Sequence, residues 1–380
     1  MYRGHTVGVV VPAYNEEAHI GEVLETMPPL VDLVYAVDDC STDGTWDVIQ
    51  SYTDRTTASG SDGETETETG SGNREAADRD PESETPTNHG RKPIPDGGTI
   101  SARPDGGVTT ARSGVTPSGS RIVPIRHEEN QGAGGALRTG YLHAYADGVD
   151  VAVAMDADGQ MDPAQLPALL DPIVEGVADY AKGNRLATRD DWREMPPFRL
   201  FGNLLLTGLT KASSGYWRLQ DPQNGYTAMS QRALSELDLA AIPDDHDYTN
   251  DLLVRLNAAG LRVADVAMPA VYGDEESTIE FGTFVRTTSV TLARGFLWRL
   301  QWTYRESGRN AVPLCYAAGV AGTAVAAIAA VVALGSLLAS SAIAGAIGQL
   351  AAVLLGAGLA ALVAAMTLDI HANRGLEVKY

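Results

Sequence analysis

Asp156 and Asp158 follow an apolar run, Val151 to Met155, of the kind that forms a buried strand. Side chains alternate faces along a strand, so two carboxylates that lie two positions apart point the same way. Converging carboxylates favour a hard cation, and Gln160, water and the oxygens of a diphosphate would complete its coordination. The pattern therefore predicts an Mg2+ or Mn2+ site, with a plain polar turn as the alternative.

Three more strand patterns run into polar loops, and helical patterns follow. The strands and loops are Val7–Val11 before Pro12–Glu17, Leu33–Val37 before Asp38–Thr45, and Ile122–Ile125 before His127–Ala136. This alternation is typical of the α/β class with a parallel sheet. Because open parallel sheets bind ligands at the carboxyl ends of their strands, we expect these loops to share one site.

The loops carry five motifs in order: PAYNEE, VDDCSTDGT, ENQGAGGALRTG, DADGQMDP and GNR. Together they resemble the family 2 glycosyltransferases, and most of all the dolichyl-phosphate mannose and glucose synthases. The resemblance covers roughly residues 6 to 285 and is interrupted once. It implies the GT-A nucleotide-sugar-binding fold, with a mostly parallel central sheet, and transfer of a hexose with inversion.

The resemblance also implies where the donor would bind. The residues it assigns to the nucleotide base and ribose are Pro12, Tyr14, Glu16 and Asp39. The residues it assigns to the metal are Asp156, Asp158 and Gln160, with Asp156 also in contact with the donor. Asp221 begins a segment, DPQNGY, that resembles the loop closing the donor sugar site, although Asp-Pro and Asn-Gly are also turn dipeptides.

The acceptor of such an enzyme is a polyprenyl phosphate, which needs cations more than a base. Its second pKa is around 6, so it is already largely ionised at neutral pH. By the resemblance, Arg185 and Arg199 handle the acceptor phosphate and the leaving diphosphate, and Asp158, Arg185 and Asp221 are the catalytic residues. Arg199 would otherwise be a surface residue. Asp251 falls where many relatives have a Glu, and helix capping is an equal alternative to a base.

Two segments depart from the family pattern. Relatives usually have Lys where this chain reads Gly132–Gly134, and Gly-x-Ser-Lys where it reads Glu275–Thr278. Both differences remove positive charge near the expected phosphates, which leaves the exact acceptor open. The Gln-x-x-Arg-Trp signature of processive polysaccharide synthases is also absent from the sequence, which disfavours a chain-elongating enzyme.

Composition restricts the setting of the protein. Its 380 residues carry a formal net charge of −21, which argues against a nucleic-acid partner. Lysine occurs only at positions 92, 182, 211 and 379, whereas arginine and aspartate are plentiful. This composition suggests adaptation to high salt, as in a halophilic archaeon. The two cysteines, Cys40 and Cys315, lie in different segments, so we expect no structural disulfide. No signal peptide precedes the first strand, so we expect a cytoplasmic catalytic domain.

The sequence predicts one insertion within the catalytic domain at 1–280 and three segments after it. Residues 51–120 are rich in Gly, Ser, Thr and acidic residues without apolar periodicity, and are predicted to be a disordered acidic insertion. Residues 281–309 mix aromatic and aliphatic residues with arginine, which suits amphipathic juxtamembrane helices; packing on the catalytic domain is the alternative. The uncharged stretch at 310–368 predicts a transmembrane hairpin at 310–369 rather than two core helices, before a cytoplasmic tail at 370–380.

These features predict a membrane-bound glycosyltransferase that moves one hexose from a UDP- or GDP-linked sugar to dolichyl or polyprenyl phosphate. Arginines flank the hairpin on both sides, so both of its ends should face the cytoplasm. The product would serve a cell-surface glycan or protein N-glycosylation. The alternatives are a transferase that extends a lipid-linked saccharide or other glycolipid, and an inactive nucleotide-sugar-binding membrane module. A nucleotidyltransferase is disfavoured, since Pro12–Glu16 is not a Gly-rich, Arg-containing loop.

Overall fold

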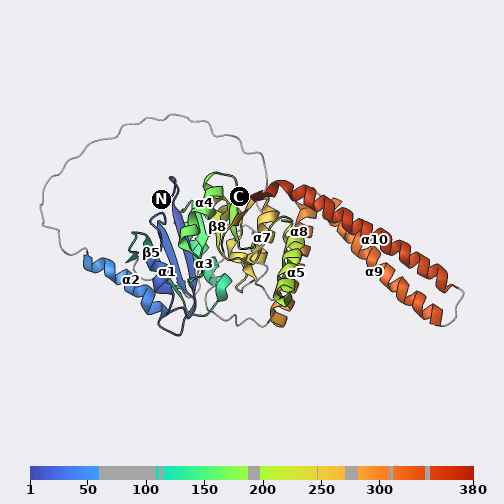
Figure 1. The fold of residues 1–380 in the computed structure, drawn as a ribbon, viewed down its shortest axis with the longest axis horizontal. Helices are drawn as coiled ribbons and strands as arrows, with labels where there is room; N and C mark the ends of the chain where they lie inside the picture. Colours follow the sequence, from blue (N-terminus) through green and yellow to red (C-terminus); the bar gives the residue numbers. More distant parts are fainter. Residues whose placement is uncertain are drawn as a thin grey trace, which may run out of the picture.

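The chain folds around one mixed sheet, and a pair of long helices projects from it (Figure 1). The computed structural model describes residues 1–59, 108–110, 114–186, 197–245, 247–269, 281–306, 308, 311–338 and 343–380. Within them the sheet has ten strands, in the order β10-β9-β7-β8-β6-β1-β2-β5-β3, with β4 paired to β5. This is the α/β fold with a mostly parallel sheet that the motifs predict.

The parallel centre of the sheet carries the polar loops. Its strands are β6 (Val151–Ala154), β1 (Val7–Ala13), β2 (Leu33–Asp38) and β5 (Arg121–His127). They pair side by side in that order and all run in one direction. Their carboxyl ends therefore lie along the same edge, which brings the predicted site residues together.

The other half of the sheet is mixed. Its strands are β8 (Thr227–Ser230), β7 (Tyr180–Asn184), β9 (Val263–Ala267) and β10 (Glu377–Lys379). β8 runs antiparallel to both β6 and β7, whereas β7, β9 and β10 are parallel to one another. β7 thus delivers Arg185 to the edge where β6 delivers Asp156.

Helices cover both faces of the sheet, which explains why its central strands are apolar throughout. One face packs against α1 (Ile20–Glu25), α2 (Thr45–Ser59) and α4 (Leu166–Val174), and the other against α3 (Gly132–Ala146), α6 (Gln231–Glu236) and α7 (Tyr248–Ala259). Three short 3-10 helices lie at Pro163–Gln165, Leu239–Ala241 and Arg374–Leu376. In β1, Val9 and Val11 pack in the core on the side of α1, α2 and α4, and Val10 packs in the core on the side of α3, α6 and α7.

The predicted insertion at 51–120 has the wrong limits. α2 continues to Ser59, and β3 (Val108–Thr110) and β4 (Gly114–Val115) pair antiparallel with β5. The strand pairing gives these polar residues backbone partners that their composition does not reveal. The rest of the predicted insertion, residues 60–107 and 111–113, lies outside the described residues.

Two apolar helices form the predicted hairpin, α9 (Ala311–Leu338) and α10 (Ala344–Asn373). Both are long and apolar enough to cross a membrane. Their side chains face outward; Val331, for example, is 71% exposed, so these helices are not the core of the catalytic domain. In Figure 1 they run side by side away from the sheet.

Two helices connect this hairpin to the sheet, α5 (Pro197–Ser214) and α8 (Phe281–Arg305). They pack on each other, and α8 also packs on α7. α8 keeps an exposed face with Val290, Leu297 and Tyr304, so one helix has both the packed face and the exposed apolar face that the sequence offered as alternatives. Its place at a membrane surface stays a prediction.

The predicted tail at 370–380 is a structured part of the domain. α10 continues to Asn373, and Glu377–Lys379 form β10, which extends the sheet beside Val263–Asp265 of β9. Three residues with one apolar side chain carry too weak a pattern to predict an edge strand. The chain thus returns from the hairpin into the catalytic domain.

Candidate active site

The loops after β1 and β2 are fastened to each other. The Asn15 amide donates to Ser41 Oγ at 2.9 Å, and the Glu16 amide donates to Thr45 Oγ1 at 2.8 Å. Asn15 and Cys40 have left-handed backbone angles, with φ of 57° and 61°. Non-glycine residues adopt this conformation rarely, so the surrounding bonds must maintain it. The predicted nucleotide edge is therefore a pre-formed surface; Tyr14 is exposed there, and Pro12 and Glu16 are partly buried.

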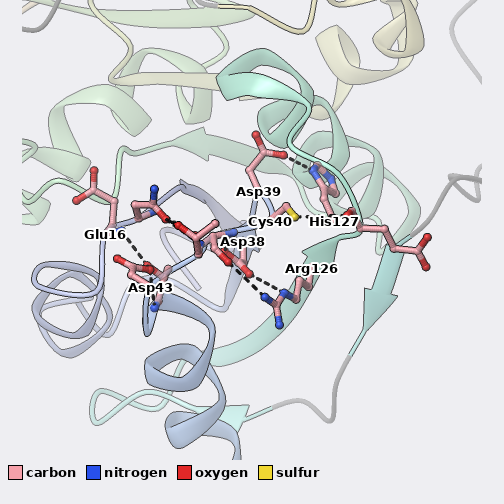
Figure 2. A network of polar contacts seen from close by, with 12 residues as sticks. Glu16, Asp38, Asp39, Cys40, Asp43, Arg126 and His127 are labelled. Atoms are coloured by element: carbon pink, nitrogen blue, oxygen red, sulfur yellow. Dashed lines mark hydrogen bonds and ion pairs between the residues drawn. The ribbon is translucent and has the colours of Figure 1, made fainter.

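The two neighbouring aspartates at the end of β2, Asp38 and Asp39, have different partners (Figure 2). Asp38 is fully buried, forms an ion pair with Arg126 at 3.0 Å and accepts a bond from the Ser41 amide, so it maintains the loop. Asp39 Oδ1 lies 2.6 Å from Nδ1 of the buried His127 and accepts the Gln131 amide at 2.8 Å. Asp39 Oδ2 accepts no hydrogen bond from the described residues.

The glycines of GAGG in α3 serve packing. The amides of Gly134 and Gly135 donate to the Asp244 carbonyl at 2.9 and 3.2 Å. A Cβ at Gly134 would overlap the Pro243 carbonyl oxygen. The start of α3 is thus covered by the 243–245 backbone, and the amides of Gly132, Gly134 and Gly135 already have acceptors.

Asp156 and Asp158 follow β6, as predicted. Burial, then the neighbouring Asp158, raises the pKa of Asp156 to about 7; Glu16 adds to this rise, and Arg185 opposes it. Asp158 Oδ1 accepts the amide of Gln160 at 2.9 Å. Among the described residues, no group of three or more His, Cys, Asp or Glu side chains is arranged as a metal site.

A divalent cation nevertheless suits this cluster. Asp156 sits among other negative groups in a poorly solvated place, and a cation would relieve that repulsion. The described residues alone supply too few oxygens for a complete site, which would suit an Mg2+ or Mn2+ ion that shares its coordination with a substrate diphosphate.

The loop at 221–225 closes directly against this cluster. A Cβ at Gly225 would lie 3.4 Å from Asp156 Oδ2 and 3.3 Å from Tyr248 Oη, so the backbone comes close to the carboxylate. Asp221, at the start of the loop, has a left-handed φ of 44°. Its carboxylate binds Arg185 through two bonds, Nε to Oδ2 at 2.8 Å and Nη2 to Oδ1 at 3.1 Å.

A buried lysine supports this pair. Lys182 is 1% exposed, and its Nζ donates to the Asp221 carbonyl. Burial lowers the pKa of Lys182 to about 8 despite the nearby Asp221 and Asp265. Burial also acts to raise the pKa of Asp221, but Lys182 and Arg185 outweigh it and the pKa falls. Asp221 is therefore an anion that orients the half-exposed guanidinium of Arg185.

The remaining predicted residues lie nearby or outside the described part. Asp251 is in the first turn of α7 and pairs with Arg255; the N-cap position belongs to Asp247, so the capping alternative for Asp251 is wrong. Burial raises the pKa of Asp251. Arg199 lies in the first turn of α5, but its side chain is not among those described, and the segment Glu275–Thr278 is also outside. Both cysteines are free, as predicted.

Comparison with known proteins is consistent with this arrangement. The model of the family "Glycosyl transferase family 2" matches residues 8–62 and 102–238, together about half of the chain. The chain belongs to this family. The match is interrupted where the acidic segment lies, and it includes the loops after β1, β2, β5 and β6.

Two relatives of this glycosyltransferase are named for lipid phosphate acceptors, and a solved structure shares part of its fold. The UDP-N-acetylglucosamine–dolichyl-phosphate N-acetylglucosaminyltransferase of Methanococcus voltae is 29% identical over 180 residues, which are 47% of this chain and 68% of that protein. The undecaprenyl-phosphate mannosyltransferase of Micrococcus luteus is 30% identical over 179 residues, 45% of this chain and 69% of that one. Glucosyl-3-phosphoglycerate synthase from Mycobacterium tuberculosis with UDP overlays with a TM-score of 0.46 and 20% identity, covering 77% of this chain and 80% of that one.

Proposed function

We propose that this glycosyltransferase transfers a hexose from a nucleotide sugar to dolichyl or another polyprenyl phosphate, with inversion, on the cytoplasmic face of a membrane. The observation that carries the proposal is the orientation of Arg185, which donates two hydrogen bonds to Asp221 and lies at the edge of the sheet where Asp156 also lies. The relatives named for lipid phosphate acceptors support it.

The reaction needs two anions to meet, and Arg185 provides the cation between them. An oxygen of the acceptor phosphate forms a bond to the anomeric carbon from the face opposite the diphosphate. The bond from that carbon to the diphosphate oxygen breaks, and its electron pair leaves with the nucleoside diphosphate. A divalent ion at Asp156 and Asp158 would neutralise the charge on that leaving group. Arg185 stays in one orientation because Asp221 and Lys182 are fixed beneath it.

The acceptor supplies its own charge, so no strong base is required. Asp251 is paired with Arg255 on the same helix, which suits a supporting residue better than one that must gain a proton during each turnover. A sugar hydroxyl as acceptor would make the opposite demand.

The base of the donor is most compatible with uracil. If the diphosphate lies at the end of β6, Asp39 at the end of β2 is two strand spacings away, about 10 Å, which a nucleoside can span. A carboxylate only accepts, so His127 Nδ1 and the Gln131 amide occupy Oδ1 and leave Oδ2 for the base. One oxygen matches the single ring N–H of uracil, whereas guanine presents two adjacent donors. The UDP named for the Methanococcus voltae relative agrees.

A donor and acceptor panel tests the proposal. Membranes containing the enzyme would be incubated with UDP- and GDP-linked hexoses and a polyprenyl phosphate, and the lipid products weighed by mass spectrometry. We expect a product with the mass of the polyprenyl phosphate plus one hexose, formed from a UDP-linked sugar. We also expect UDP to inhibit the reaction at least tenfold more strongly than GDP. A product made only by lengthening an existing lipid-linked saccharide would support the glycolipid alternative, and tighter inhibition by GDP would contradict the base assignment.

A further inference from the structure

A buried ion pair joins the hairpin to the catalytic domain. Arg299 of α8 binds Asp369 in α10 through two bonds, Nη1 to Oδ1 and Nη2 to Oδ2, both 2.9 Å. The side chains are only 2% and 3% exposed. This pair lies just beyond the uncharged stretch of the hairpin, where a single aspartate near the end of an apolar helix needs a partner.

Every polar group of the pair is used. Arg299 Nε donates to the Ser213 carbonyl at 2.7 Å, and Nη2 also donates to the Ala212 carbonyl at 2.9 Å, both at the end of α5. Asp369 accepts further bonds from Asn373 Nδ2 at 2.8 Å and Trp217 Nε1 at 3.2 Å. One docked orientation of α5, α8 and α10 satisfies all of these groups together.

The backbone lies close to one side of this pair. A Cβ at Gly215 would lie 2.6 Å from Arg299 Nη1, and the φ of Gly215 is +80°, which side chains rarely adopt. Beneath the pair, Phe296 and Tyr316 meet edge to face at 5.0 Å, which packs α8 on α9. Both hairpin helices are therefore held close to their attachment.

The end of α10 is secured a second time. After Asn373 the chain enters the sheet as β10, and Glu377 Oε1 accepts the amide of Arg218 at 2.5 Å. α10 has 30 residues, about 45 Å, and therefore exceeds a bilayer core of about 30 Å. The excess turns can place Asp369 at the membrane surface, where the catalytic domain begins.

We propose that Arg299 and Asp369 are positioning residues that lock the catalytic domain to the hairpin, so that the candidate active site stands at a fixed height and orientation over the bilayer. The role rests on the proposed function, because the acceptor phosphate is held at the membrane surface by its lipid chain. α5 transmits the position: its last carbonyls bind Arg299, and its first turn contains Arg199, 14 positions before Ser213. A hairpin attached only by a flexible linker would let the candidate active site tilt away from the acceptor.

The test compares two acceptors with the same phosphate, one that reaches the candidate active site from the bilayer and one that reaches it from water. Full-length enzyme in liposomes would be assayed with a long polyprenyl phosphate in the bilayer and with a water-soluble ten-carbon prenyl phosphate. For Asp369→Asn and Arg299→Met we expect the rate with the long acceptor to fall at least tenfold and the rate with the short acceptor to change less than threefold. Since the two residues act as one unit, the double variant should be no worse than the poorer single variant. Glu306→Gln, which removes an exposed charge beside α8, should affect neither rate.

Equal losses of rate with both acceptors would overturn the proposal and indicate a general structural role. An unchanged rate with both acceptors would also overturn it. A readout independent of activity uses spin labels at Ala146→Cys on α3 and Leu338→Cys at the hairpin tip, with Cys40 and Cys315 replaced by Ser. The distance distribution should be narrow in the parent protein and broaden in Asp369→Asn; an unchanged distribution would refute the lock. Wild-type enzyme without any lipid product would count against the proposed function alone, and the label distances would then decide the lock.

Discussion

Replacing Asp156 by Asn should make the metal-free enzyme more stable at alkaline pH while damaging its function. The carboxylate lies near Asp158 and Glu16 in a poorly solvated position, and its pKa rises from an ordinary value of 3.8 to about 7. An amide of the same shape has no charge to desolvate. The substitution therefore removes an electrostatic cost that a bound cation would offset in the native site.

The size and sign of the effect follow from the pKa. The folded-state pKa lies above the unfolded value, so the folded protein is favoured by protonation and loses stability as the pH rises from about 4 through about 7. A pKa change of about three corresponds to about 4 kcal/mol, and partial exposure of the side chain reduces this to about 2 kcal/mol. For a domain of this size that is an increase in Tm of about 4–8 °C above pH 8. At pH 4 the two proteins should differ little.

Thermal unfolding of detergent-solubilised protein in EDTA measures this difference at pH 8.5 and pH 4. Asp47→Asn, which neutralises an exposed carboxylate in α2, is the matched control and should move the Tm by less than about 1 °C at either pH. Addition of Mg2+ and UDP should reverse the ranking, since ligands that bind the native state stabilise wild-type protein more.

Two results would refute the reasoning. If Asp156→Asn lowered the Tm at pH 8.5 in EDTA, the carboxylate would be a stabilising partner rather than a repelled charge. If the gain in Tm were the same at pH 4 and pH 8.5, ionisation of Asp156 would not be its cause.

Four further predictions concern activity. Asp158→Asn should lower it at least a hundredfold with the fold retained, because stabilising the leaving diphosphate is worth several kcal/mol; near wild-type turnover in the variant or in excess EDTA would contradict this. Arg185→Ala should remove nearly all activity while Asp251→Asn keeps at least a tenth, and the reverse order in initial rates would indicate a hydroxyl acceptor. His127→Leu should raise KM for the nucleotide sugar about tenfold with little change in kcat, whereas a fall in kcat alone would place His127 elsewhere. Excision of residues 62–105 with a short Gly/Ser linker should leave Tm and turnover nearly unchanged, since loop length costs little; loss of either would give the segment a role.

The order of the elements could be predicted because it depends on local patterns. The apolar runs that became β1, β2, β5 and β6 are short and strongly apolar, and each ends in a polar loop. Once parallel pairing is assumed, the loops must meet at one edge. Asp39, Asp156 and Arg185 accordingly lie on that edge, whereas the roles predicted for them come from the family resemblance and stay predictions.

The supporting residues could not be predicted in this way, because their partners are distant in the sequence. His127 meets Asp39 across 88 positions, and Lys182 reaches Asp221 across 39. A lone His in a strand or a lone Lys beside a glycine gives no local signal of such a partner. The apolar neighbours of Lys182 in β7 were the only hint, since a lysine in a buried strand needs an acceptor.

The chain's end shows the same limit. Asp369 marked the end of the uncharged stretch, but its partner Arg299 lies 70 positions earlier in a helix rich in arginine. Nothing in the sequence separates Arg299 from Arg294, which is exposed on the same helix. Burial of one and exposure of the other depends on how α5 and α8 pack.

The most direct measurement of the central claim compares polyprenyl phosphate with the polyprenol of the same chain length as acceptors for the purified enzyme. With a UDP-hexose donor, we predict that only the phosphate gains a hexose, that the product releases the sugar in mild acid, and that Arg185→Ala makes none. Transfer to the alcohol, or a product stable to mild acid, would contradict phosphate-acceptor chemistry and the role given to Arg185.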